Sequence, residues 1–234
     1  MDLPTVDQIA ARAAAVRRTL DEAAARAGRD PAGVRIVAIT KGWPIEVCRA
    51  ARDAGLTALG ENRVQEALPK VAALPDLAWH LVGHLQSNKA RAAAAAFAWI
   101  HSVDSAALLR RLDAAAHDAG SRPRALLQVN VTGEATKSGF DPRALADAAV
   151  VAAVRDTRSI EVVGLMTIAA AGGDPRPAFT RLRGLRDELE QRAGIALPEL
   201  SMGMSGDAAI AVEEGATVVR IGTALFGARP AGGG

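Results

Sequence analysis

Lys41 is the residue of this chain best placed to do chemistry, because it ends a short apolar stretch. Residues 34–40 form a β-branched run typical of a buried strand, and Gly42 and Pro44 then break the strand. Burying an ammonium group is costly unless it is paired or neutralised. An amine in such a site loses proton affinity and becomes a nucleophile toward carbonyl groups. The remaining lysines are expected in solvated helices or a loop: Lys70, Lys89 and Lys137.

Two glycine-containing segments near the end of the chain predict a phosphate site. Residues 204–207 (Met-Ser-Gly-Asp) and 220–223 (Arg-Ile-Gly-Thr) each precede a predicted helix. Each offers a hydroxyl group and backbone N–H groups at a helix start, where the helix dipole favours an anion. Ordinary capping by Ser205 and Thr223 is the alternative. With Lys41, such a site fits either pyridoxal 5′-phosphate (PLP) or an aldolase-type lysine acting on a sugar phosphate.

The predicted secondary structure would bring these segments together. About eight strands alternate with helix-length segments, a pattern that favours a single-domain α/β fold, the (β/α)8 TIM barrel. The competing architecture is a doubly wound open sheet. An amphipathic stretch over residues 6–27 predicts an extra N-terminal helix. We expect one domain over residues 1–230 and a flexible tail over 231–234. The predicted strands are residues 34–40, 56–60, 77–82, 97–103, 124–131, 160–168, 200–202 and 217–221.

Polar residues follow many of the predicted strands. In a TIM barrel the active site lies at the carboxyl ends of the strands, so these side chains would meet at one mouth. Turn-forming and capping residues account for part of the set. Its members are Lys41, Glu61, Asn62, His80, His84, Ser102, Asp104, Asn130, Thr167, Ser205, Arg220 and Thr223.

Several other classes of function are disfavoured. His80 and His84 have the spacing of paired metal ligands but straddle a strand end, so we expect no metal site. Cys48 is the only cysteine, which rules out an intrachain disulfide. The net charge of +2 comes from scattered charges, which disfavours nucleic acid. With neither a run of about 18 apolar residues nor a secretory signal, we expect a cytoplasmic protein without membrane contact.

Ordered motifs over nearly the whole chain carry a family resemblance. They include Thr40-Lys41, residues 60–66 (Gly-Glu-Asn-Arg-Val-Gln-Glu) and residues 79–89 (Trp-His-Leu-Val-Gly-His-Leu-Gln-Ser-Asn-Lys). Further matches are residues 130–131, 133–140, 164–167, 201–207, 220–223 and 226–227. In these motifs the chain resembles the pyridoxal-phosphate homeostasis proteins (YggS/PROSC-like), single-domain relatives of the barrel domain of alanine racemase. The resemblance also implies the TIM-barrel fold.

The resemblance implies a role for each candidate site residue. Lys41 is expected to form the internal aldimine with PLP, and Arg220 to lie beside the pyridine nitrogen. The phosphate is expected on Ser205, Gly206, Gly222 and Thr223, and the ring against Asn62, His80 and Met166. Two departures from the family pattern are expected to alter local packing: Ala208 stands where an aromatic residue is frequent, and no tyrosine follows residues 227–229.

The expected function is to bind PLP and take part in intracellular PLP (vitamin B6) and amino-acid homeostasis, without strong catalytic turnover. A guanidinium beside the pyridine nitrogen keeps that nitrogen unprotonated, which makes PLP a poorer electron sink. Racemisation also needs a second acid or base opposite the lysine. In alanine racemase that group is a tyrosine, and this chain has none.

Two alternatives stay open at this stage. One is a PLP-dependent racemase or lyase of small amino acids, with His80 or another mouth residue as second base. The other is a barrel that binds a sugar phosphate without PLP. The partners considered are PLP and PLP-dependent apoenzymes, and the expected state is a monomer or weak dimer.

Overall fold

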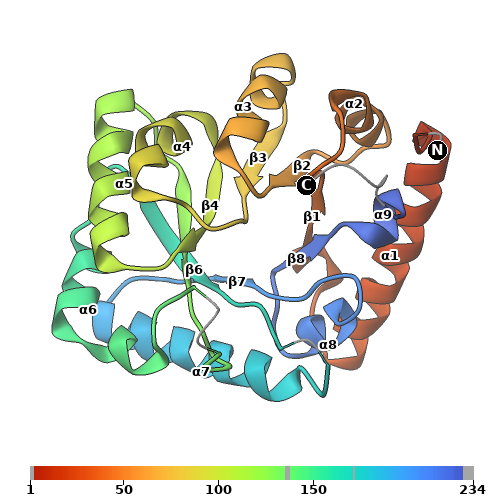
Figure 1. The fold of residues 1–234 in the computed structure, drawn as a ribbon. Coiled ribbons are helices and arrows are strands. Elements are labelled where there is room, and N and C mark those ends of the chain that lie inside the picture. Colours follow the sequence, from red (N-terminus) through yellow and green to blue (C-terminus); the bar gives the residue numbers. More distant parts are fainter. Residues whose placement is uncertain (1–2, 135–137, 171, 229–234) are drawn as a thin grey trace.

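Eight parallel strands close into a barrel in sequence order, β1 to β8, in the computed structural model (Figure 1). The structure describes residues 3–134, 138–170 and 172–228. Lys137 and the tail predicted over 231–234 lie outside these ranges. The strands are β1 Arg35–Ile39, β2 Ala58–Glu61, β3 Ala78–Leu81, β4 Trp99–Val103, β5 Arg124–Gln128, β6 Glu161–Met166, β7 Glu199–Ser201 and β8 Val218–Ile221.

Barrel closure settles the choice between the two predicted architectures. β1 pairs with β8 in parallel, from Arg35 opposite Val218 to Ala38 opposite Ile221, so the sheet is not open. The single-domain TIM barrel is therefore confirmed. Glycines allow close approach at two places: a Cβ at Gly83 would lie 2.2 Å from the Asn62 oxygen, and one at Gly164 would lie 1.8 Å from the Glu199 oxygen.

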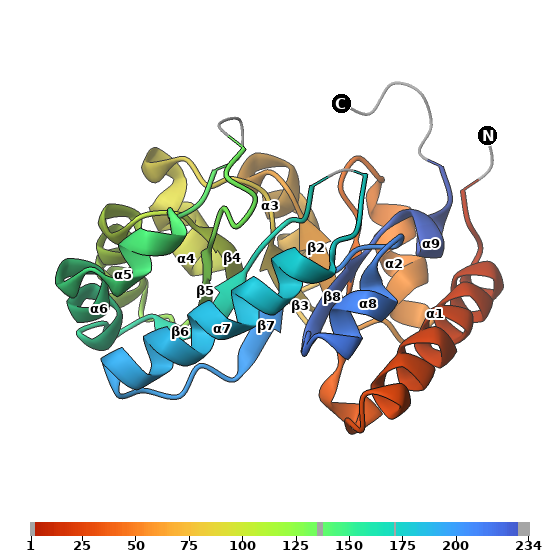
Figure 2. The ribbon, with the colours of Figure 1, turned by 90° about the horizontal axis from the view of Figure 1, so that it is seen from below.

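Helices surround the barrel, and the predicted N-terminal helix is among them. α1 begins after Thr5, whose side chain accepts from the N–H of Gln8 in a capping box. It packs against α2, α8 and α9, and Figure 2 shows α8 and α9 beside it. The helices are α1 Val6–Arg26, α2 Ile45–Asp53, α3 Val64–Ala73, α4 Ala90–Ala96, α5 Ala106–Ala119, α6 Ala148–Arg155, α7 Arg176–Ala193, α8 Ala208–Glu213 and α9 Thr223–Phe226, with 3-10 turns at Pro31–Gly33, Ser87–Lys89 and Pro142–Ala146.

The apolar residues form a main core between helices and sheet and two smaller clusters apart from it. The main core contains Ala38 and Leu59. The smaller clusters contain Val37 with Ala58 and Val218, and Trp99 with Leu126, Val163 and Met166. Because neighbouring residues of a strand point to opposite faces, the smaller clusters fill the barrel interior.

The segment between β5 and β6 contains two short helical elements. Residues 142–146 form a 3-10 turn and α6 follows as a separate helix, because Asp147 between them has extended backbone angles. Within the described ranges, no helix is both long and apolar enough to cross a membrane.

Candidate functional site

A cavity of about 530 Å³ opens at the carboxyl ends of the strands. Its volume lies within the range of about 300–1,000 Å³ typical of small-molecule sites. Most of the site residues expected from the sequence line it: Lys41, Asn62, Ser205, Gly206, Arg220, Gly222 and Thr223. None of the described residues on its wall is Asp or Glu. The cavity therefore suits an anionic ligand.

Lys41 reaches this cavity from the turn that follows β1. Gly42 has a φ of 71°, a left-handed angle that favours glycine, and α2 begins at Ile45. The residue before the lysine is fixed, because Thr40 donates its N–H to the Gly60 oxygen at 2.9 Å. Lys41 itself is half-buried. The sequence thus ends a strand, turns the chain and leaves the amine at the barrel mouth.

Arg220 comes from the inner face of β8 and is 5% exposed. Its Nη1 donates to Ser201 Oγ at 2.7 Å and its Nη2 to the Thr167 oxygen at 2.8 Å. Both acceptors are neutral, and within the described chain no carboxylate lies at ion-pair distance. Burial lowers the pKa of Arg220 to about 10, against a weaker opposing effect of Asp207, so the side chain stays protonated at neutral pH. A buried cation without a counterion is costly, which favours an electron-rich ligand group beside it.

The two loops predicted to hold phosphate meet in the structure. Ser205 Oγ accepts from the Ala224 N–H at 3.4 Å, which joins the loop after β7 to α9. In the described chain, the N–H groups of Ser205, Gly206 and Thr223 have no acceptor. A Cβ built at Gly206 would meet nothing within 4 Å, so its backbone faces open space.

The N–H groups, rather than a long helix dipole, carry the anion preference of these loops. α8 has 6 residues and α9 has 4. Unpaired N–H groups and hydroxyls at a concave surface are the usual donors to a phosphate. The loops therefore provide donors for an oxyanion beside the end of β1, because β8 pairs with β1 and Gly222 lies against Ile39.

His80 and Met166, which were expected to line a cofactor ring, do not lie on the cavity wall. Strand alternation points both into the barrel interior, one layer below the mouth. Met166 is fully buried among Trp99, Leu126 and Val163, and the His80 ring stacks on Trp99 with a centroid distance of 5.3 Å. The cavity wall at these places is formed by Val82 and Ile168, each two residues further along its chain segment.

Sequence reasoning missed a hydrogen-bonded chain that runs from His80 to Arg220. His80 Nδ1 lies 2.9 Å from His101 Nε2, and His101 Nδ1 lies 2.8 Å from Ser201 Oγ, which accepts from Arg220. Burial lowers the pKa of His80 to about 3, helped by Arg35, and holds the pKa of His101 well below its usual range. Both histidines are therefore neutral. The signal available in the sequence was the position of His101 inside the predicted strand of residues 97–103, and all residues of β4 are in fact buried.

The tautomers of His80 and His101 follow from counting the donors and acceptors along these hydrogen bonds. Ser201 Oγ already accepts from Arg220, so its O–H is free to donate to His101 Nδ1. His101 then donates from Nε2 to His80 Nδ1, and His80 Nε2 carries a hydrogen. That Nε2 has no partner among the described residues, so this assignment leaves one unsatisfied group. The reverse assignment leaves two, because the Ser201 O–H would also lack an acceptor.

Two further expectations concern His84 and Lys70. His84 Nδ1 pairs with Asp104 Oδ2 at 3.1 Å rather than with His80, and the described residues contain no group suited to a metal ion. The expectation that Lys70 is solvated is wrong. Its side chain is buried and its Nζ lies 2.7 Å from Glu61 Oε1, because α3 packs its inner face on β2.

Known protein sequences resemble this chain over nearly its whole length. Residues 12–230 match the family model described as alanine racemase, N-terminal domain. The pyridoxal phosphate homeostasis protein of Pseudomonas aeruginosa is 46% identical over 230 residues, which cover 96% of this chain and 97% of that protein. The corresponding protein of Aquifex aeolicus is 42% identical over 223 residues, covering 93% of this chain and 97% of that protein.

Solved structures of related proteins superpose on this chain over most of its length. PipY of Synechococcus elongatus without PLP superposes with a TM-score of 0.84 at 43% identity, covering 94% of this chain and 100% of PipY. PipY with PLP bound gives a TM-score of 0.81 at 42% identity, with the same coverage. Alanine racemase from Streptomyces coelicolor gives 0.73 at 24% identity, covering 97% of this chain and 59% of the enzyme, and shows the fold alone.

Proposed function

Because this chain belongs to the pyridoxal phosphate homeostasis protein family, we propose that it binds PLP in the carboxyl-end cavity and takes part in PLP homeostasis. One observation carries the proposal. Lys41 and Arg220 face a cavity whose described wall has no carboxylate, and Arg220 is buried with neutral acceptors. PLP has an aldehyde, a pyridine nitrogen and a phosphate. Each has a complementary group here, which supports the fit.

In this proposal Lys41 is the covalent attachment point. Its neutral amine condenses with the aldehyde, forming a C=N bond and releasing water. The Ser205 and Thr223 hydroxyls, with the N–H groups of Ser205, Gly206 and Thr223, hold the phosphate by charge-assisted hydrogen bonds. Gly222 belongs to the same phosphate loop as Thr223, and Asn62, which also lines the cavity, is assigned to the ring.

Arg220 favours binding over turnover. Its guanidinium stays charged and would donate to the pyridine nitrogen, which keeps that nitrogen unprotonated and weakens the electron-sink chemistry that PLP supplies when bound. The chain also contains no tyrosine to serve as a second acid or base. We therefore propose a protein that stores or passes on PLP, with PLP-dependent apoenzymes as partners. The proposal includes a cytoplasmic location, one PLP-binding domain over residues 1–230, and a monomeric or weakly dimeric state.

A PLP-dependent racemase or lyase is the second candidate. His80 cannot be its second base, because its ring is buried below the cavity and its pKa is lowered to about 3. His84 is the histidine on the cavity wall, with 55% of its side chain exposed and Asp104 as its partner. This candidate therefore depends on His84.

Deuterium exchange separates the two candidates. The purified protein is loaded with PLP, incubated with alanine or serine in D2O, and Cα deuteration is followed by NMR. We expect a yellow protein with the absorption of lysine-bound PLP, and no exchange at catalytic rates. Exchange at catalytic rates that disappears in both Lys41→Ala and His84→Gln would instead establish the enzyme. A protein that stays colourless with added PLP would instead support the remaining alternative, a barrel that binds a sugar phosphate without PLP.

A further inference from the structure

Lys70 of α3 lies directly behind the turn that carries Lys41. It is 9% exposed, and its Nζ donates to Glu61 Oε1 at 2.7 Å and to the Thr40 oxygen at 3.1 Å. The Thr40 hydroxyl donates to the same Glu61 oxygen at 2.6 Å. A cation from α3, a carboxylate from β2 and the residue before Lys41 therefore form one buried network.

This network fixes the peptide unit that leads into Lys41. The Thr40 carbonyl and the Lys41 N–H belong to the same planar peptide, so orienting one orients the other. The Thr40 carbonyl accepts from Lys70 and also from the Trp43 N–H at 3.1 Å. The N–H of Thr40 donates to the Gly60 oxygen. The direction in which the Lys41 side chain leaves the backbone is thus set by contacts on both sides of Thr40.

Stability alone does not explain the pair. A buried ion pair pays a large desolvation cost, and well-packed apolar residues in its place are often neutral or stabilising. Here the cost is not fully offset, because Glu61 Oε2 has no hydrogen-bond partner among the described residues. The pair adds little stability, yet both of its members hydrogen-bond to Thr40, the residue before the reactive lysine. This combination points to a role in orienting Lys41.

We propose that Lys70, together with Glu61, is a positioning residue for Lys41. It holds the Thr40–Lys41 peptide so that the Lys41 amine meets the PLP aldehyde. The inference rests on the proposed function, since it concerns the rate at which Lys41 is attached to PLP. It assigns no contact between Lys70 and the cofactor.

The test removes the pair without leaving a buried charge. The double variant Glu61→Gln/Lys70→Met is compared with the wild type for the rate of PLP attachment, followed by absorption. A misplacement of about 1 Å can cost on the order of 100-fold in rate, so we expect attachment about 10- to 100-fold slower. Pyridoxamine 5′-phosphate has the ring and phosphate but no aldehyde. Its affinity should be unchanged, because the phosphate loops and Arg220 are intact.

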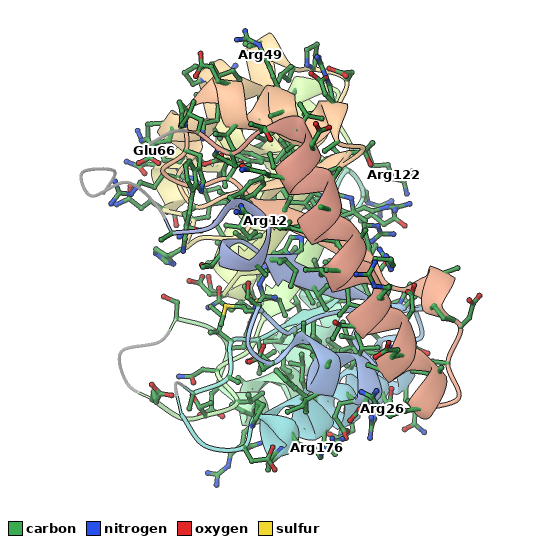
Figure 3. All side chains as sticks on the ribbon, turned by 90° about the vertical axis from the view of Figure 1, so that its right-hand side faces the viewer. Arg12, Arg26, Arg49, Glu66, Arg122 and Arg176 are labelled. Carbon is green, nitrogen blue, oxygen red and sulfur yellow. The ribbon has the colours of Figure 1, made fainter. Side chains whose placement is uncertain are left out.

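A matched control lies on the same helix. Arg63 and Glu66 form an exposed pair at 3.0 Å, with 64% and 41% of their side chains exposed, and Glu66 projects from the surface in Figure 3. Arg63→Met/Glu66→Gln likewise removes one positive and one negative charge, at the start of α3, without touching Thr40. We expect wild-type attachment rates and wild-type pyridoxamine 5′-phosphate affinity in this control.

Each outcome decides between distinct claims. Equal attachment rates in the double variant and the wild type would overturn the positioning role, and so would an equal loss of attachment and pyridoxamine 5′-phosphate affinity. A wild-type protein that binds no PLP at Lys41 would instead refute the proposed function. If the double variant does not fold, Lys70→Arg serves, because it keeps the charge but changes the donor geometry. Wild-type attachment in Lys70→Arg would count against the proposal.

Discussion

The barrel has a cavity at each end, and the arginines of the two cavities differ in their partners. The amino-end cavity, about 870 Å³, is larger than the carboxyl-end cavity of about 530 Å³. Its arginines pair with carboxylates: Arg17 with Asp21 at 3.8 Å, Arg35 with Glu199 at 3.4 Å and Arg124 with Glu161 at 3.6 Å. Among the described residues, Arg220 at the other end has only neutral acceptors.

The difference indicates that charge balance, rather than volume, sets the proposed ligand site apart from the amino-end cavity. At the amino end, Arg35 and Arg124 also lie over the Trp99 ring, 4.9 Å and 5.1 Å from its centroid. Such contacts satisfy the guanidinium groups within the protein. Arg220 faces a wall without described carboxylates, and in our proposal an electron-rich group of the ligand lies beside its guanidinium. Four predictions test this contrast.

The largest effect is expected from Lys41→Ala. The variant should lose all covalent PLP, because no other amine lies on the described cavity wall. Its fold should survive, because Lys41 is a half-buried residue in a turn rather than part of the apolar core. Absorption and circular dichroism measure the two properties. A variant that unfolds, or one that keeps the covalent absorption, would contradict the assignment.

The next largest effect is expected from Ser205→Ala/Thr223→Val. Hydrogen bonds to a charged group contribute about 1.5–3 kcal/mol each, so PLP affinity should fall on the order of 100-fold or more. Equilibrium dialysis measures it. Ser105→Ala is the control, because Ser105 caps α5 by accepting from the Leu108 N–H and is not among the described residues on the cavity wall. Unchanged affinity in the double variant would refute the phosphate assignment.

A moderate effect is expected from pH, through the histidines between the two cavities. His80 and His101 are neutral in the folded state because burial lowers the pKa of each. In the unfolded chain a histidine takes up a proton below about pH 6.5. Their contribution to stability is therefore present above pH 6.5 and lost as pH falls toward about 3, the folded pKa of His80.

Urea unfolding at several pH values checks this sign. Each neutral histidine should remove about 1.4 kcal/mol of unfolding free energy per pH unit below 6.5. The decline should be shallower in His80→Asn, which has one such group fewer. A wild-type stability that is flat between pH 6.5 and 4.5 would mean that the histidines accept protons in the folded state.

The smallest effect is expected at the amino end. Arg124→Met removes one member of a pair whose side chains are 48% and 46% exposed, so it should cost about 0–1 kcal/mol of stability. PLP affinity should stay within about twofold of the wild type, which corresponds to a binding free-energy difference of less than about 0.4 kcal/mol. A large loss of affinity would show that the two cavities are coupled and that the contrast between them is incomplete.

The sequence predicts the barrel and most of the site because both depend on local patterns. Alternation of strands and helices gives the fold, and the hydroxyl–glycine segments around Ser205 and Thr223 mark the cavity loops. The placement of His80 was not predictable in the same way. Whether a residue near a strand end faces the mouth or the layer below depends on where the strand stops, and a shift of one or two residues changes the answer.

The buried pairings also lie beyond sequence patterns. Lys70 sits in an amphipathic helix, where solvation is the usual state of a lysine. Its contact with Glu61 depends on how α3 packs on β2, which only the tertiary structure specifies. The neutral acceptors of Arg220 likewise come from Ser201 and Thr167, on two other strands or their ends. Such partners are far apart in sequence and carry no local signal.

Mapping the modified lysine tests the central claim most directly. The PLP-loaded wild-type protein is reduced with borohydride, which converts the C=N bond into a stable amine, and digested for mass spectrometry. We predict that the pyridoxyl group is found on Lys41. A label on Lys70, Lys89 or Lys137 in place of Lys41, or no label on any lysine, would contradict the account.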